Sequence, residues 1–233
     1  MTTLTNIAVF GDSVSEGVIL DGSKYKVYEN RFSDLCAKYF GANIENNARF
    51  GHTIIRGERI VNSYMDVLKN SVYKYAVLCF GGNDCDYDWK KIAQDPSEHH
   101  EPKCSIETFR NTYADVINKI KSIGISPVLL SLPPIDSKRY FDRVTAGLKA
   151  SNVLKWLGGD VDYITRWHER YNLEVFKIGS LVSVPVIDIT SAFLEKPNIK
   201  NYLCDDGIHP NADGHRLIAN AIENHVAQRN IIL

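Results

Sequence analysis

The sequence lacks an excess of charge of either sign and has no long apolar segment. Its 233 residues include 27 lysine and arginine side chains against 28 aspartate and glutamate side chains, a formal net charge of -1. Nucleic acids and anionic lipids attract basic proteins, so this balance argues against both as partners. No apolar run approaches the roughly 18 residues of a membrane span, and the N-terminus shows no signal-peptide pattern. We expect no membrane insertion and a cytoplasmic location.

Cysteine is scarce, and no pair has the C-x-x-C spacing. An odd number of scattered cysteines fits reduced thiols better than a disulfide framework or a zinc site. They are Cys36, Cys79, Cys85, Cys104 and Cys204. Internal repeats and low-complexity linkers are also missing. With 44% hydrophobic residues, the chain is long enough for one α/β core, and we predict a single domain over residues 1–233. Nothing in the sequence specifies an oligomeric state.

Short apolar segments alternate with segments of helical periodicity. The expected strands are residues 7–10, 42–48, 75–80, 125–132 and 184–187. The expected helices are residues 27–40, 54–68, 105–124, 160–183 and 210–226, the last starting at Pro210. This alternation predicts a three-layer α/β/α sandwich around a sheet of about five mostly parallel strands. Pro185 favours an edge position for the fifth strand. We expect residues 84–104 and 133–158 to be long connections near a site.

Three short polar motifs follow strand-like segments or precede a helix. They are Gly11-Asp12-Ser13, Gly81-Gly82-Asn83-Asp84 and Asp206-Gly207-Ile208-His209-Pro210. Because the carboxyl ends of parallel strands share one edge of a sheet, we expect the motifs to converge there. A serine hydroxyl needs a base within hydrogen-bond reach, and the base needs a group that orients it. The motifs therefore predict acyl transfer, with Ser13 as nucleophile, His209 as base and Asp206 as its orienter.

Each motif also has a plain structural interpretation. Gly-Asp-Ser after a strand is an ordinary turn and helix cap, and Asn83 is typical of a turn. Asp206 with Pro210 is a common way to begin a helix. The three-residue spacing from Asp206 to His209 nevertheless suits a carboxylate that accepts from imidazole Nδ1. The other six histidines lack such a carboxylate at a comparable junction; they are His52, His99, His100, His168, His215 and His225.

The chain resembles the SGNH hydrolases, also called GDSL esterases and lipases, which are named for four separated sequence blocks. Gly11-Asp12-Ser13 resembles the serine block, and residues 47–53, with Gly51, resemble the glycine block. Residues 81–84, with Asn83, resemble the asparagine block, and residues 206–210 resemble the histidine block. The Gly-x-Ser-x-Gly elbow of α/β-hydrolases is missing, since Ser15 stands at the final glycine position.

The resemblance implies a flavodoxin-like fold, a serine esterase activity and no cofactor. It implies Ser13, Asp206 and His209 as the catalytic residues. It also implies an oxyanion hole formed by the backbone N–H groups of Ser13 and Gly51 and by the side chain of Asn83. The expected partner is a small-molecule ester.

The two long connections contribute aromatic side chains that could contact a substrate, namely Tyr87, Trp89, Tyr140, Phe141 and Trp156. Packing against the sheet explains them equally well. Because the sequence shows no apolar lid, we predict a short acyl group, such as acetyl, on a carbohydrate or another polar alcohol. The alternative within this chemistry is a lysophospholipase or thioesterase.

Two alternatives without catalysis remain open. Asp84, Asp86, Asp88 and Asp95 have the spacing of a calcium loop, but Trp89 stands where that loop needs glycine. A flavodoxin-like sheet also hosts mononucleotide binders, although no Gly-x-Gly-x-x-Gly motif or P-loop follows any expected strand. We predict no metal ligands in this chain.

Overall fold

The computed structural model describes residues 5–70 and 72–228, and its centre is a parallel five-stranded sheet. The strands lie in the order β4-β1-β5-β6-β7, and each neighbouring pair is parallel. Their bounds are β1 Asn6–Gly11, β4 Asn43–Asn46, β5 Tyr73–Cys79, β6 Ser126–Leu130 and β7 Val186–Ile187. Counted along the sheet this is the flavodoxin-like order 2-1-3-4-5, which confirms the predicted fold. The strand near Pro185 lies at an edge, as expected.

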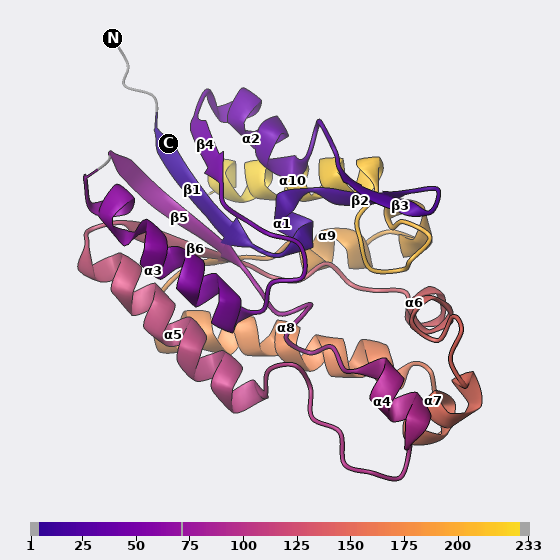
Figure 1. Ribbon diagram of the computed structural model, residues 1–233. Helices are drawn as coiled ribbons and strands as arrows, with labels where there is room; N and C mark the ends of the chain where they lie inside the picture. The colour runs from indigo at the N-terminus through magenta and orange to yellow at the C-terminus, as the bar shows by residue number, and fades with distance from the viewer. Residues whose placement is uncertain (1–4, 71, 229–233) are drawn as a thin grey trace.

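Helices cover both faces of the sheet (Figure 1). One face carries α3 (Ile54–Asn70), α5 (Ile106–Ser122) and α8 (Tyr163–Leu181). The other carries α2 (Phe32–Phe40), α9 (Thr190–Leu194) and α10 (Ala212–Gln228). The interior strands β1, β5 and β6 contribute apolar side chains to both layers, as burial between two helical layers requires. Ala8 and Phe10 of β1 face the first layer, and Cys79 and Leu130 face the second.

The remaining elements gather near the carboxyl ends of the strands. Helix α1 (Ser13–Glu16) follows β1, and the hairpin β2–β3 (Val18–Asp21, Lys24–Val27) comes next. The short helices are α4 (Trp89–Gln94), α6 (Ser137–Val144), α7 (Ala150–Trp156) and the 3-10 helix η1 (Ile199–Tyr202). Helices α4, α6 and α7 share an apolar cluster with the start of α8. Figure 1 shows this group beyond the end of the sheet.

The structure corrects several expected elements. The helix expected over residues 27–40 begins at Phe32, because Val27 ends strand β3 and the hairpin before it was not foreseen. The connections expected at 84–104 and 133–158 contain three short helices. Asp88 and Asp136 accept hydrogen bonds at the beginnings of α4 and α6, a capping signal present in the sequence.

The last helix begins at Ala212, after the expected Pro210. Pro210 forms an antiparallel bridge with Leu203, and the Asn211 side chain accepts a hydrogen bond from Gly214 N–H at 3.0 Å. Asn211 therefore takes the capping role at the start of the helix. Within the described ranges, no helix has the length and apolarity needed to cross a membrane.

Candidate active site

Ser13 lies where the interior strand β1 passes into α1. Gly11 ends the strand, and a Cβ atom there would lie 2.7 Å from the carbonyl oxygen of Cys79 and 2.6 Å from the Ser15 hydroxyl. Only glycine fits so close to the neighbouring strand. The Asp12 carboxylate then accepts a hydrogen bond from Val14 N–H at 3.0 Å and caps the short helix. Ser13 is therefore held just beyond the carboxyl end of β1, at the first position of helix α1.

Ser13, His209 and Asp206 form one hydrogen-bonded chain. His209 Nε2 lies 2.9 Å from Ser13 Oγ, and His209 Nδ1 lies 2.7 Å from Asp206 Oδ2. The other carboxylate oxygen of Asp206 accepts the backbone N–H groups of Ile208 and His209, each at 3.1 Å. Burial raises the pKa of the Asp206 carboxyl, but the hydrogen bonds and charge of His209 outweigh it and lower the pKa overall. The geometry holds an ionised carboxylate behind the imidazole.

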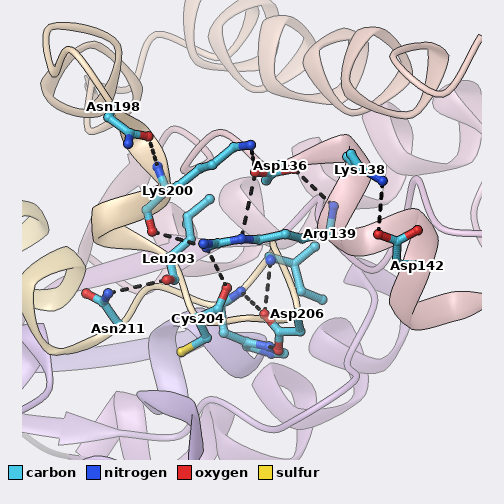
Figure 2. A network of polar contacts seen from close by, with 12 residues as sticks. Asp136, Lys138, Arg139, Asp142, Asn198, Lys200, Leu203, Cys204, Asp206 and Asn211 are labelled. Carbon is cyan, nitrogen blue, oxygen red and sulfur yellow. Dashed lines mark hydrogen bonds and ion pairs between the residues drawn. The ribbon is translucent and has the colours of Figure 1, made fainter.

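A network of polar contacts fixes the histidine loop, which runs between η1 and α10 and carries Asp206 and His209 (Figure 2). Arg139, on α6, donates to the carbonyl of Lys200 at 3.1 Å and lies 3.5 Å from that of Cys204. Asp136 N–H donates to the Gly207 carbonyl at 2.7 Å. Gly207 has φ +79°, and a Cβ atom there would lie 2.6 Å from the Asp136 carbonyl oxygen. Helix α6 therefore supports the histidine loop from outside.

Gly51 and Asn83 line the same cavity as Ser13. Gly51 has φ +71°, a conformation that other residues adopt only with strain, and open space surrounds its Cα. Asn83 follows the two glycines after β5. The two loops are joined because the Asp84 carboxylate accepts the N–H of Ile54, the first residue of α3, at 2.9 Å. The expected oxyanion residues therefore line one cavity together with Ser13.

The cavity beside Ser13 has a volume of about 280 Å³. Its walls include the expected Tyr87, Trp89 and Tyr140, and also Trp156. Phe141, in contrast, does not line the cavity; it packs into the apolar cluster of α4, α6 and α7. Successive side chains on a short helix point in different directions, so Tyr140 and its neighbour Phe141 face different surroundings.

Tyr140 and Trp89 use their polar atoms within the protein. Both donate to Asp86 Oδ1, Tyr140 from its hydroxyl at 2.6 Å and Trp89 from its indole N–H at 2.8 Å. Lys103 lies 2.6 Å from the other oxygen of Asp86. Tyr140 and Trp89 therefore offer mainly ring surface to the cavity.

Several residues of the site were not singled out in the sequence. Tyr25 of β3 and Phe50 both lie against His209, with ring centroids at 5.1 and 5.8 Å. Trp167 and His168, on one turn of α8, also line the cavity. The sequence signal for the last pair was their position near the start of a long amphipathic helix. No local pattern pointed to Tyr25, since the hairpin that carries it was missed.

The carboxyls next to the site are strongly affected by burial. Burial raises the pKa of Asp12 to about 6, although the Val14 N–H and the nearby His209 ring act in the opposite direction. Burial, together with the charge of Asp12, raises the pKa of Asp84 to about 7 despite the bond from Ile54 N–H. These two carboxyls therefore titrate near neutral pH.

The acidic residues with calcium-loop spacing have separate tasks. Asp84 caps α3, Asp86 binds the side chains of Trp89, Tyr140 and Lys103, and Asp88 caps α4. In the part of the chain that the structure describes, no three His, Cys, Asp or Glu side chains converge so as to hold a metal ion.

Comparison with known proteins gives matches over nearly the whole chain. A lipase/acylhydrolase from Enterococcus faecalis is 21% identical with a TM-score of 0.69, covering 97% of each chain. A catalytic mutant of an acetylxylan esterase from Geobacillus stearothermophilus is 15% identical with a TM-score of 0.67, covering 97% of this chain and 96% of the other. TesA is 16% identical with a TM-score of 0.64, covering 96% and 99%. At such identities the likeness establishes the fold. No curated protein matched the chain.

A family model supplies the stronger result. The model of the GDSL-like lipase/acylhydrolase family matches residues 9–217, which include all four sequence blocks. The resemblance seen in those blocks is thereby confirmed. The chain belongs to the GDSL-like lipase/acylhydrolase family and is an acyl hydrolase.

Proposed function

We propose that this protein is a serine esterase that hydrolyses small carboxylic esters through an acyl-enzyme, as a single catalytic domain. The observation that supports this most directly is the hydrogen-bonded chain from Asp206 through His209 to Ser13. A serine hydroxyl is a weak nucleophile unless a base within hydrogen-bond reach removes its proton. His209 is at that distance, and Asp206 orients it.

In the proposed reaction, His209 Nε2 takes the proton of Ser13 as Oγ attacks the ester carbonyl. The negative oxygen of the tetrahedral intermediate is stabilised by the N–H groups of Ser13 and Gly51 and by the Asn83 amide. His209 then gives its proton to the leaving alcohol, and the acyl group stays on Ser13. A water molecule repeats these steps on the acyl-enzyme and restores the free hydroxyl.

We further propose that the acyl group is short, such as acetyl, and that the alcohol is a carbohydrate or another polar molecule. A cavity of about 280 Å³ lies at the small end of ligand pockets, whose volumes start at roughly 300 Å³. Its aromatic walls suit a flat ring better than a long flexible chain. An acetylxylan esterase among the structures of the same fold agrees with this choice.

The test is hydrolysis of p-nitrophenyl esters from acetyl to long-chain, alongside acetylated sugars, by the wild type and by Ser13→Ala. We expect activity to be highest on acetyl esters and to be lost in Ser13→Ala. Undiminished turnover by Ser13→Ala would overturn the serine mechanism. Activity rising steeply with chain length, or a preference for thioesters or lysophospholipids, would overturn the short-acyl assignment and favour the alternatives.

A further inference from the structure

His168 is a buried histidine that the proposed reaction does not use. It lies on the second turn of α8, is only 4% exposed, and lines the cavity together with Ser13 and His209. A titratable side chain buried beside the catalytic serine needs an explanation, because burying a polar group without partners is costly.

The two ring nitrogens of His168 have different surroundings among the described residues. Nδ1 is fully buried and has no hydrogen-bond partner. Nδ1 lies 3.7 Å from Glu169 Oε1, which is within ion-pair distance but too long for a hydrogen bond. The other oxygen of Glu169 accepts a bond from Asn172 at 3.1 Å. Nε2 makes no hydrogen bond with a described residue and is not among the fully buried atoms, so it is the ring nitrogen open to the cavity, where a ligand can supply its partner.

The walls around His168 are aromatic. Trp89, Trp156 and Trp167 all line this cavity, and they are the only tryptophans in the sequence. Tyr87 packs between them, with its ring centroid 4.8 Å from that of Trp156 and 5.8 Å from that of Trp89. The indole N–H groups of Trp89 and Trp167 are already bonded, to Asp86 and to the Cys85 carbonyl. The walls therefore present ring surface, and His168 adds a polar group.

We propose that His168 is a substrate-binding residue that hydrogen-bonds a ring hydroxyl of the alcohol part of the ester, within a subsite walled by Tyr87, Trp89, Trp156 and Trp167. This proposal rests on the proposed function. An acetyl group offers no hydrogen-bonding atom besides its carbonyl, which the oxyanion donors occupy, so the partner of His168 belongs to the alcohol. A hydroxyl both donates and accepts, as a neutral imidazole does. The apolar faces of a hydroxylated ring suit aromatic walls, so the chemical class is an acetylated sugar.

The experiment compares two sugar esters with a control ester that has no ring hydroxyls. One is methyl glucopyranoside acetylated on its primary hydroxyl, and the second is methyl xylopyranoside carrying one acetyl group; cyclohexylmethyl acetate is the control ester without ring hydroxyls. We expect His168→Phe to lower the preference for the sugar esters over the control ester by about 5- to 30-fold, the loss expected for one buried hydrogen bond. The change should appear in KM rather than in kcat.

Two further variants separate a binding role from a structural one. His168→Gln, which keeps a donor and an acceptor, should restore a large part of the preference. His99→Phe, a change at an exposed histidine on the loop between α4 and α5, should leave the preference at the wild-type value. If His168→Phe loses the same activity on all three esters, or loses none on any of them, the proposal is overturned. It is also overturned if the wild type shows no preference for either sugar ester over the control ester.

Binding measured without turnover distinguishes this inference from the proposed function. Titration calorimetry on Ser13→Ala and on Ser13→Ala/His168→Gln and Ser13→Ala/His168→Phe measures Kd for the sugar acetates directly. Weaker binding only in the His168→Phe double variant supports the subsite, even if Ser13 were found not to be the nucleophile. If His168→Phe does not fold, the wild type alone tests the subsite through inhibition of p-nitrophenyl acetate hydrolysis. Methyl glucopyranoside should inhibit this reaction more strongly than cyclohexanemethanol. Equal inhibition by the two alcohols overturns the proposal.

Discussion

The Asp84 carboxylate accepts a hydrogen bond from the backbone N–H of Ile54 at 2.9 Å. This bond joins the loop after Gly51 to the loop of Asn83, the two loops that supply the proposed oxyanion donors. Asp84 is fully buried, and its second oxygen has no partner among the described residues. A carboxylate at the first N–H of a helix also interacts favourably with the helix dipole. One buried side chain therefore links the two loops of the proposed oxyanion hole.

Asp84→Asn should make the stability of the protein less sensitive to pH. Burial raises the pKa of Asp84 from 3.8 to about 7 in the folded chain. A carboxyl with a raised pKa stabilises the folded chain fully at pH values below its pKa in the unfolded chain. This stabilisation is lost as the pH rises through its pKa in the folded chain. Between about pH 5 and about pH 8 the wild type should lose up to roughly 2–3 kcal/mol more than the variant, which does not titrate. Thermal unfolding at both pH values measures this, and the exposed Asp142→Asn serves as control. Equal pH dependence in wild type and Asp84→Asn would contradict the prediction.

Gly51→Ala should reduce both stability and kcat. Gly51 has φ +71°, which costs an alanine about 1–2 kcal/mol, and a shift of its N–H would weaken an oxyanion donor worth about 10²- to 10³-fold in kcat. Gly22→Ala is the matched control, since Gly22 has φ +60° and equally open surroundings in the β2–β3 turn. Both variants should lose similar stability in denaturant titrations, and only Gly51→Ala should lose kcat. A similar kcat in the two variants would exclude the donor role of Gly51.

Arg139→Met should lower kcat while leaving KM nearly unchanged. The guanidinium binds the carbonyl of Lys200, and it lies against that of Cys204 at the start of the histidine loop. Without it the imidazole of His209 is held less firmly. Because a misplacement of about 1 Å costs about 10²-fold in rate, we expect the smaller shift in this variant to cost about 3- to 10-fold. Lys138→Met removes a neighbouring exposed ion pair to Asp142 (Figure 2) and should change nothing. Steady-state kinetics of both variants on one acetyl ester test this, and equal kcat values for both would refute it.

Phe50→Ala should reduce kcat/KM with little effect on stability. The Phe50 ring lies nearly parallel to the His209 imidazole, at an interplanar angle of 16°, yet it is 51% exposed. Ring contacts of this kind contribute about 0.5–1.5 kcal/mol, which corresponds to a loss of about 2- to 10-fold. Tyr39→Ala, an exposed aromatic residue on α2, provides the control. Unchanged kinetics in Phe50→Ala would show that the ring does not support the imidazole.

The sequence was sufficient for the sheet and for the part of the site that depends on local spacing. Strand β1 and the motif after it were readable because a strand buried on both faces is continuously apolar and ends abruptly at Gly11. The contact between Asp206 and His209 was predictable because the two residues are three positions apart and one turn of backbone brings them together. The convergence of Ser13 with His209, which lies 196 residues later, followed from the shared edge of a parallel sheet.

The cavity walls were decided by tertiary structure alone. Tyr25 reaches His209 from strand β3, whose four residues are exposed and give no core signal. Phe141 packs into the apolar cluster of α4, α6 and α7, while Tyr140 lines the cavity. The amphipathic pattern of α8 showed that Trp167 and His168 lie on a helix, but not which surface they face. Ser13 and Asn83 are placed by the strands β1 and β5 that precede them. Wall residues are placed by how short helices pack on one another, and that packing depends on contacts between segments far apart in the chain.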